Sequence, residues 1–250
     1  MSVICKATNV SKSFRPDFYK KPVQVLKNVN FQINQGRFVG FIGPNGAGKT
    51  TTIKCMMQFI FPDHGEISFF DQTDFIEAKR KIGFLPERPY FQEFLSGVEF
   101  LKLHWNLCGL KAADFQNRAE EVLEQVKLTH AKHKKLRDYS KGMLQRIGIA
   151  QALLARPEFL ILDEPMSGLD PDGRILIKDI LKSFKEKKLT VLMSSHLLED
   201  VEELCEDLII LHKGETLFYG AITEFKQNFS SLEAAYKAFK GQIEEVNHNA

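Results

Sequence analysis

The chain has 250 residues, a length that fits one large domain or one core with an inserted subdomain. Its 44% hydrophobic and 26% charged residues exclude a mainly disordered or collagen-like chain. The 34 basic and 32 acidic residues leave a net charge of +2, which is too balanced for a free-standing nucleic-acid coat or a polybasic membrane anchor.

The N-terminal part of the chain predicts strands. Val29, Phe31 and Ile33 alternate with polar residues, which is the period of a half-buried strand. Between this strand and an earlier one over residues 8–14 lies RPDFYKKP, whose prolines and charges predict a basic loop.

Five short apolar runs follow and are typical of buried parallel strands. They are FVGFI (38–42), KIGFL (81–85), FLIL (159–162), TVLM (190–193) and LIIL (208–211). The first enters a glycine-rich turn, after which apolar residues recur at helical spacing, at Ile53, Met56, Met57 and Ile60. The last precedes Lys213-Gly214 and a further strand-like run, which together predict a hairpin.

The long segment between the second and third runs predicts an inserted helical lobe, because apolar residues recur there at spacings of three and four. The three stripes are Phe94, Val98, Leu101, Trp105 and Cys108; Phe115, Ala119, Val122 and Val126; and Met143, Ile147, Ala150 and Leu154. Pro157 disfavours helical geometry at Arg156 and ends the last of them. We expect the last dozen residues of the chain to fray.

No apolar stretch approaches the ~20 residues needed to span a bilayer, and the N-terminus lacks the long apolar core of a signal peptide. We therefore expect a cytoplasmic protein that contacts a membrane only through a partner. The cysteines lie far apart without a CxxC pair, which predicts free thiols rather than a zinc or redox site. They are Cys5, Cys55, Cys108 and Cys205.

GPNGAGKT (43–50) has the spacing of a phosphate-binding loop. Gly43, Gly46 and Gly48 let backbone N–H groups face inward around phosphate oxygens. Lys49 is expected to reach the terminal phosphates, Thr50 to ligate Mg²⁺, and the helix that begins near Gly48 to add its positive end. The competing interpretation is a plain glycine-rich turn, which the preceding strand and following helix disfavour.

FLILDEP delivers Asp163 and Glu164 to the carboxyl end of a buried strand, the edge at which open parallel sheets bind ligands. Asp163 is expected to hold Mg²⁺, directly or through water, and Glu164 to orient and polarise an attacking water. The alternative is a pair of solvated acids at the end of a strand.

The motifs follow one another in the order GPNGAGKTT, YSKGMLQR, LILDEP, SGLD and a histidine after VLMSS. In these motifs and their order, the chain resembles the ATP-binding subunit of an ABC transporter. The resemblance covers residues 3–225. It implies an α/β fold: a P-loop NTPase core with an N-terminal antiparallel β subdomain and an inserted α-helical subdomain. It also implies one ABC ATPase domain over 1–225, with its core at 1–86 and 157–225 and its helical lobe at 87–156, then a C-terminal helix and tail at 226–250.

The resemblance implies that ATP is bound by the whole phosphate loop, with Mg²⁺ as its companion ion. The loop residues concerned are Gly43, Pro44, Asn45, Gly46, Ala47, Gly48, Lys49, Thr50 and Thr51. Phe14 stands where the family places an aromatic ring against adenine; its alternative role is in the core, and Phe18 or Tyr19 could take its place. Glu87 stands where the family has a glutamine that links Mg²⁺ and water to the helical lobe. Its carboxylate could still ligate the ion, but it brings an extra negative charge.

YSKGM (139–143) matches the family's signature loop, usually LSGGQ, at Ser140 and Gly142. In the family these residues face the γ-phosphate of ATP held by a second subunit in a head-to-tail dimer, so one chain carries two half-sites. Ser140 is also a good N-cap for the following helix, which is its plain structural role. Lys141 and Met143 depart from the usual glycine and glutamine, and SKGM is similar to the variant found in many drug, lipid and polysaccharide exporters.

Two further residues match family positions. His196 matches the switch histidine, expected to sense the γ-phosphate and to act in catalysis with Glu164. Asp170 in SGLD matches the loop that crosses the dimer interface, and its alternative role is a turn acid before Pro171. Four aromatic residues fall where the docking groove for a permease is expected, although they could equally form the core of the lobe. They are Phe84, Tyr90, Phe91 and Phe94.

These features predict an ATP-binding and ATP-hydrolysing subunit of an ABC transporter, working as a homodimer on the inner face of the cell membrane with a separate permease and without nucleic acid. The SKGM and LPE variants favour an exporter, and the cargo is not encoded in these residues. One rival is a soluble ABC-type ATPase of nucleic-acid repair or translation, which would need a second cassette or a long coiled-coil insertion. The other is a slow regulatory ATP-binding subunit, suggested by Glu87 and Lys141 but disfavoured by Asp163, Glu164 and His196.

Overall fold

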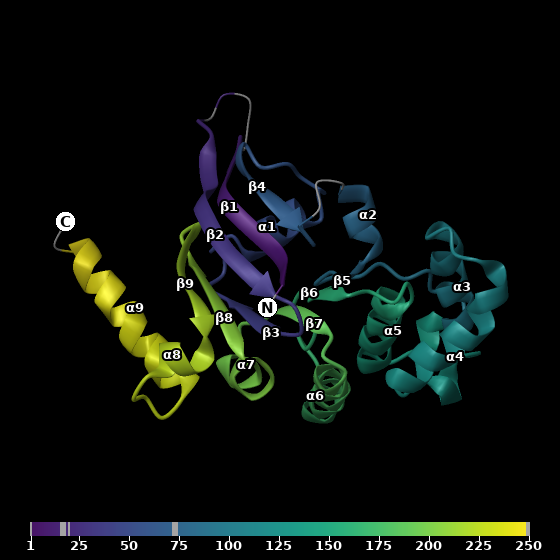
Figure 1. Cartoon of the computed structure of the whole chain (residues 1–250). Helices are drawn as coiled ribbons and strands as arrows, with labels where there is room; N and C mark the ends of the chain where they lie inside the picture. Colours follow the sequence, from purple (N-terminus) through teal and green to yellow (C-terminus); the bar gives the residue numbers. More distant parts are fainter. Residues whose placement is uncertain (1, 16–18, 20, 72–74, 249–250) are drawn as a thin grey trace.

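The computed structural model describes residues 2–15, 19, 21–71 and 75–248, so Phe18 lies outside the described residues. A six-stranded sheet in the order β5-β6-β7-β3-β8-β9 forms the centre (Figure 1). Its strands are β3 (Phe38–Ile42), β5 (Ile82–Leu85), β6 (Phe159–Leu162), β7 (Thr190–Ser194), β8 (Asp207–His212) and β9 (Glu215–Ala221). The first five of these pair in parallel and β9 is antiparallel to β8, which confirms the five buried runs and the hairpin.

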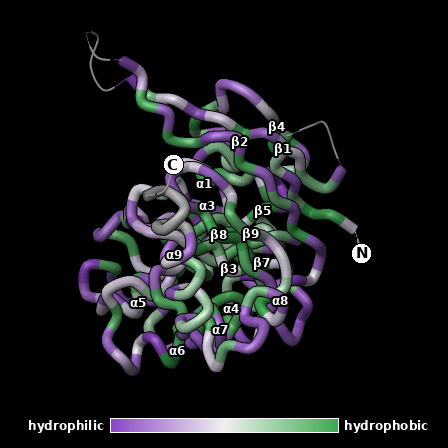
Figure 2. The backbone as a smooth tube through the Cα atoms, turned by 90° about the vertical axis from the view of Figure 1, so that its left-hand side faces the viewer, coloured by the Kyte–Doolittle hydropathy of each residue, from purple (hydrophilic) through white to green (hydrophobic). Residues whose placement is uncertain are grey.

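The five parallel strands of the central sheet are buried on both faces, which explains their uninterrupted apolar runs, whereas β9 at the edge is partly exposed. Alternate residues of each strand point to opposite faces. Phe38 and Ile42 of β3 belong to one hydrophobic core, and Val39 and Phe41 to another on the opposite side. Figure 2 shows the hydrophobic segments gathered around β3, β7 and β8, with hydrophilic segments toward the outside.

One of these cores lies beneath a three-stranded antiparallel sheet of order β2-β1-β4. Its strands are β1 (Val3–Phe14), β2 (Val23–Asn34) and β4 (His64–Phe69). The alternation predicted at Val29, Phe31 and Ile33 is confirmed, since all three are buried. Helix α1 (Lys49–Met56) contributes to the same core. It ends earlier than its apolar spacing predicted, because Gln58 adopts a left-handed φ of 51°.

The helical lobe lies at one end of the molecule, at the right of Figure 1. It holds α3 (Gly97–Leu107), α4 (Phe115–Gln125) and α5 (Lys141–Leu153), joined through 3₁₀ turns at Ala112–Asp114, Thr129–Ala131 and Leu136–Asp138. The prediction that Phe94 begins the first helical stripe is wrong. Ser96 caps α3 by accepting a hydrogen bond from the Glu99 N–H, and the Glu99 carboxylate accepts one from the Ser96 N–H at 2.7 Å. This capping box is visible in the sequence as Ser-x-x-Glu and sets the start of the helix.

Helix α5 lies directly against the end of β5. A Cβ placed on Gly148, in the middle of α5, would lie only 2.7 Å from Cδ1 of Leu85, the last residue of β5. Glycine at this position therefore permits the close approach of helix and strand. Leu85 is also two residues before Glu87, so the lobe and the segment that leads to Glu87 are in contact.

Helices α6 (Pro171–Glu186) and α7 (Leu198–Leu204) pack against the first core, and α2 (Phe75–Arg80) follows β4. At the C-terminal end, α8 (Ile222–Lys226) and α9 (Leu232–His248) meet through the rings of Phe225 and Phe239, whose centroids are 5.3 Å apart. Helix α9 runs through most of the last dozen residues, which were expected to fray, and ends at His248. Within the described part of the chain, no helix combines the length and apolar character needed to cross a membrane.

Candidate functional site

A cavity of about 540 Å³ opens at the carboxyl ends of β3, β6 and β7. It brings together most of the residues that the sequence predicted for nucleotide and metal binding. The lining residues are Val25, Pro44, Asn45, Gly46, Ala47, Gly48, Lys49, Thr50, Thr51, Glu87, Asp163, Glu164, Ser167 and His196. Segments more than 100 residues apart in the chain therefore meet in one site, as the crossover connections of a parallel sheet require.

The loop between β3 and α1 wraps one side of the cavity, and two of its glycines are needed for close packing. Gly43 has a φ of 155°, and a Cβ there would lie 2.3 Å from the Leu211 carbonyl oxygen. Gly48 has a φ of 107°, and a Cβ there would lie 2.6 Å from the Leu26 side chain. Gly48 caps α1 without a side chain, and the first three residues of the helix, residues 49–51, line the cavity at its positive end.

Lys49, the first residue of α1, is buried at the wall of the cavity. Its ammonium donates a hydrogen bond to the Gly43 carbonyl at 2.6 Å and a longer one to the Pro44 carbonyl at 3.4 Å. Burial lowers the pKa of Lys49, and the nearby carboxylates of Glu164 and Asp163 oppose that shift. The cation is thus fixed at the loop with acids on the opposite wall.

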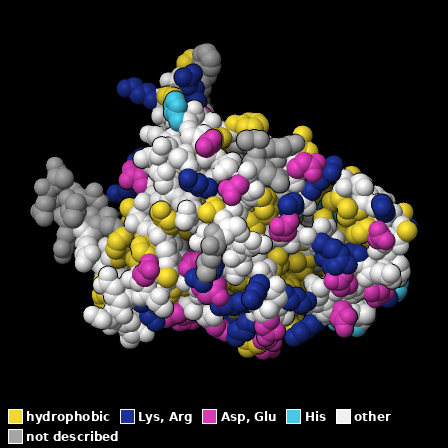
Figure 3. Space-filling view, viewed as in Figure 1, with side chains coloured by type: hydrophobic (Ala, Val, Ile, Leu, Met, Phe, Trp, Pro, Cys, Tyr) yellow, Lys and Arg dark blue, Asp and Glu magenta, His cyan; other side chains and the backbone are white. Residues whose placement is uncertain are grey.

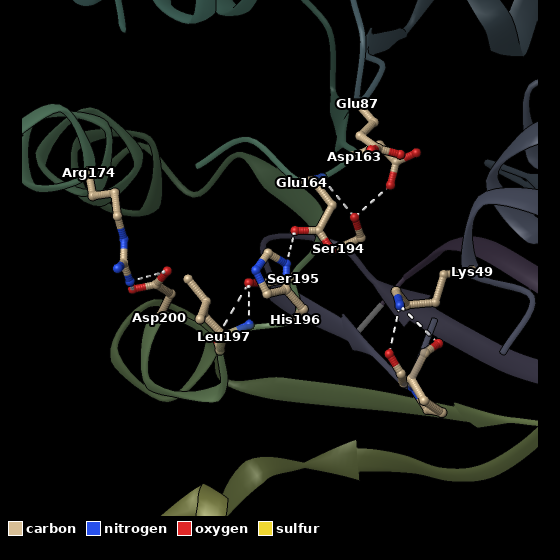
Figure 4. A network of polar contacts seen from close by, with 12 residues as sticks. Lys49, Glu87, Asp163, Glu164, Arg174, Ser194, Ser195, His196, Leu197 and Asp200 are labelled. Atoms are coloured by element: carbon tan, nitrogen blue, oxygen red, sulfur yellow. Dashed lines mark hydrogen bonds and ion pairs between the residues drawn. The ribbon is translucent and has the colours of Figure 1, made fainter. Parts of the chain in front are cut away.

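Asp163 and Glu164 follow β6 and are held by one hydroxyl group. Ser194, at the end of β7, donates to the Asp163 carboxylate at 2.6 Å and accepts from the Glu164 N–H at 2.8 Å (Figure 4). Asp163 is 3% exposed, and this burial raises its pKa, while the Ser194 hydrogen bond opposes the rise and Glu87 adds to it. The alternative of two solvated acids does not describe Asp163.

Glu164 has a left-handed backbone with a φ of 53°, which is uncommon for a residue with a side chain. The hydrogen bond from its N–H to Ser194 supports this conformation. Its side chain turns to His196, whose Nδ1 lies 2.7 Å from Oε2 of Glu164 (Figure 4). A strained backbone at a carboxylate paired with histidine is typical of residues placed for chemistry.

Ser140, Gly142 and Asp170 do not line this cavity. Ser140 is the N-cap of α5 and accepts from the Met143 N–H at 3.3 Å. Asp170 is the N-cap of α6 and accepts from the Gly173 N–H at 3.2 Å, with Pro171 in the first turn. Their plain structural roles are therefore present, and both side chains are also exposed.

Phe14 does not line the cavity either, but it lies close by on the same sheet. It is 39% exposed at the end of β1 and pairs with Val23 of β2. Val25, two residues further along β2, does line the cavity, and an irregularity in the strand pairing at Lys12 and Ser13 separates it from the Phe14–Val23 pair. Tyr19, the other described candidate, is 95% exposed.

Two cavity residues, Val25 and Ser167, were given no role in the sequence prediction, and neither was Ser194, which holds Asp163 and Glu164 from behind the cavity wall. Ser194 was visible as the first serine of VLMSSH, at the carboxyl end of a predicted strand. Ser167 begins SGLD, where only the acid had been singled out. Val25 carried no signal, because a valine in a strand is ordinarily a core residue.

The charges of the cavity favour a phosphate compound that arrives with a metal ion. Three carboxylates, those of Glu87, Asp163 and Glu164, line it with Lys49. This excess of negative charge would repel a bare polyphosphate, and a divalent cation would neutralise it. The oxygen donors of Thr50, Asp163 and Glu87 suit Mg²⁺, which binds through one or two carboxylates and substrate phosphates. No group of three or more His, Cys, Asp or Glu that could hold a metal ion without other ligands occurs among the described residues.

Comparison with known proteins agrees with this geometry. The family model described as ABC transporter matches residues 26–167. An uncharacterized ABC transporter ATP-binding protein, YxlF of Bacillus subtilis, is 42% identical over 204 residues, which cover 82% of this chain and 68% of that protein. The bacitracin transport ATP-binding protein BcrA of Bacillus licheniformis is 38% identical over 221 residues, covering 87% of this chain and 69% of that protein.

Solved structures show the same relationship. The structure of an ATP-binding subunit of an ABC transporter superimposes with a TM-score of 0.81 at 30% identity, covering 95% of this chain and 99% of the other. The dimeric post-hydrolysis structure of the ATP-binding cassette MJ0796, bound to ADP and Pi, gives a TM-score of 0.73 at 27% identity, covering 88% of this chain and 99% of the other.

Proposed function

This chain belongs to the ABC transporter ATP-binding family and is an ATP-binding ATPase subunit, and we propose that two copies of it enclose two ATP molecules to drive a separate membrane permease. The proposal is supported mainly by one observation: the residues predicted to bind ATP lie in two separate places on the chain. The phosphate loop, Asp163, Glu164 and His196 line one cavity, whereas Ser140, Gly142 and Asp170 are presented elsewhere. A second copy, arranged head to tail, would supply the missing groups, and the dimeric solved relative supports this arrangement.

Within one cavity, the proposed roles follow from position. The loop N–H groups and Lys49 hold the phosphates, and Phe14 stacks on adenine beside Val25. Glu164 orients and accepts a proton from the attacking water, and His196 contacts the γ-phosphate and holds the Glu164 carboxylate at 2.7 Å. Thr50, Asp163 and Glu87 would hold Mg²⁺, which would supply positive charge next to the phosphates. Loss of the γ-phosphate removes contacts from both halves, so hydrolysis releases the dimer.

A mixing experiment tests the division of the site between two copies. Lys49→Ala disables the phosphate loop and Ser140→Ala disables the signature loop, so each variant alone should fail to form the ATP-bound dimer. A heterodimer of the two retains one intact composite site, built from Lys49 of one copy and Ser140 of the other. We expect ATP-dependent association to return in the mixture, measured by light scattering. If the mixture stays monomeric where the unsubstituted chain associates, each chain holds a complete site.

The placement of Mg²⁺ near Glu87 is tested by Glu87→Gln. The amide oxygen can still contact the ion or its water, but one negative charge is lost, and with it a cause of the raised pKa of Asp163. We expect ATPase activity to survive and the Mg²⁺ concentration for half-maximal activity to rise several-fold. Glu93→Gln, on the same segment but outside the cavity, serves as the control. An Mg²⁺ profile identical to that of the control would make Glu87 peripheral.

The permease contact is proposed for the aromatic surface beside the lobe. Of the four aromatic residues predicted there, Phe91 packs in the lobe core against Phe100, at a centroid distance of 5.5 Å. Tyr90 and Phe94 are 84% and 70% exposed, and Phe84 contacts the exposed ring of Phe59. Figure 3 shows hydrophobic side chains at the surface over α3 and beside β5. A permease that stimulates hydrolysis equally in Tyr90→Ser and in the unsubstituted chain would exclude this surface.

Export is the proposed direction of transport. It is supported by SKGM and by the relative BcrA, whose name assigns it to bacitracin transport. We also propose that residues 1–225 form one ABC ATPase domain, with its helical lobe at 87–156.

A further inference from the structure

Two of the loops assigned above to different nucleotide sites lead into adjacent helices. Asp170, proposed to face the ATP of the second copy, caps α6. His196, proposed to face the ATP of its own cavity, precedes α7 by two residues. The two helices pack together, and Figure 4 shows Arg174 of α6 reaching toward Asp200 of α7.

The contact between α6 and α7 centres on a fully buried carboxylate. Asp200 is 0% exposed, and both of its carboxylate oxygens accept hydrogen bonds from one guanidinium nitrogen of Arg174 at 2.9 Å. Lys178, one turn further along α6, contacts the same carboxylate at 2.8 Å. A buried carboxylate is strongly destabilising without such partners, so it fixes how the two helices lie.

Each end of this contact is tied to a loop by short backbone links. The Arg174 N–H donates to the Asp170 carbonyl at 3.0 Å, so Arg174 lies one turn from the cap of α6. Asp200 lies four residues after His196, in the first turn of α7, and the Ser195 hydroxyl accepts from the Leu197 N–H at 3.0 Å across His196. A displacement of the Asp170 loop that moves the first turns of α6 therefore moves Asp200 and, with it, His196.

We propose that Arg174 and Asp200 are positioning residues that couple the two nucleotide sites of the dimer, by linking the Asp170 loop to His196 within each chain. The inference rests on the proposed sandwich dimer. Coupling here means that ATP bound at one site changes the affinity of the other site for ATP. Such a coupling commonly changes an affinity about 5- to 150-fold. Arg174 uses a single nitrogen for both oxygens, and its buried Nε has no hydrogen-bond partner among the described residues, so an ammonium could make the same contact.

The test compares Arg174→Gln, Arg174→Lys and Lys182→Gln by the ATP dependence of hydrolysis. Arg174→Gln leaves Lys178 on Asp200, so the buried charge keeps one partner. Lys182 is the matched control, because it joins the same two helices through Glu203 at 2.6 Å but is half-exposed and further from both loops. We expect Arg174→Gln to lower the Hill coefficient for ATP to about 1 and kcat about tenfold, with ATP affinity of the single chain unchanged. Arg174→Lys and Lys182→Gln should keep the unsubstituted behaviour.

The possible outcomes separate this inference from the function on which it rests. Undiminished cooperativity in Arg174→Gln, while the unsubstituted chain is cooperative, overturns the coupling role and leaves the dimer intact. A lowered thermal unfolding midpoint with unchanged cooperativity assigns Arg174 to stability alone and also overturns it. If the unsubstituted chain never associates with ATP, the sandwich dimer fails and this inference fails with it.

Discussion

Glu164→Gln is expected to lower kcat for ATP hydrolysis by about 100-fold or more, the size of effect that removal of a general base produces, while ATP binding is retained. Glutamine has nearly the same shape as glutamate. Its amide oxygen can accept a hydrogen bond from water but is too weak a base to take the proton. The Ser194 hydrogen bond that supports the backbone comes from the Glu164 N–H, so the substitution leaves it in place. Because release depends on loss of the γ-phosphate, the ATP-bound dimer should accumulate.

Gel filtration in Mg²⁺-ATP, alongside phosphate release, measures both effects. Glu158→Gln is the matched control, since Glu158 precedes the opposite end of β6 and pairs with Lys81 on the surface at 3.1 Å. It changes charge equally and should hydrolyse ATP at the normal rate. A Glu164→Gln chain that turns over normally, or that elutes only as a monomer with ATP, would contradict the assignment of Glu164.

Lys49→Ala is expected to weaken nucleotide binding about 10- to 100-fold, because a hydrogen bond that involves a charged group contributes about 1.5–3 kcal/mol. The effect should be larger for ATP than for ADP, since Lys49 is proposed to contact the terminal phosphates. Loss of the ammonium also leaves Glu164, Asp163 and Glu87 without the cation that opposes their charge. Fluorescence titration with a labelled nucleotide measures the affinity.

Lys54→Ala provides the comparison for Lys49. It lies in the last turn of the same helix, is exposed, and does not line the cavity. Equal affinities in the Lys49→Ala and Lys54→Ala chains would remove Lys49 from phosphate binding. A fall in ADP affinity as large as that for ATP would place Lys49 nearer the inner phosphates.

The fold and the phosphate loop could be predicted because their signals are local. Each buried strand appears as a short apolar run, and GPNGAGKT combines glycines, lysine and threonine at fixed spacing between a strand and a helix. Asp163 and Glu164 followed from the same rule, since they end a buried run.

Other features depend on contacts between distant segments and left no readable pattern. Val25 lines the cavity only because the small sheet lies over the phosphate loop. Ser194 binds both Asp163 and Glu164, which requires β6 and β7 to be neighbours. The start of α3 was misplaced at Phe94 because apolar spacing was given more weight than the capping box at Ser96. Arg174 and Asp200 look like ordinary surface charges in the sequence, and only the packing of α6 on α7 buries their contact.

The close approach of Gly148 to Leu85 has a mechanical consequence. A helix and a strand this near to each other, with no larger side chain between them, cannot slide or tilt independently without a steric clash. Ser140 caps that helix and Glu87 follows that strand, so a movement of α5 shifts the segment that leads to Glu87 at the edge of the cavity. In the proposed dimer, a displacement of the lobe would therefore change the position of Glu87.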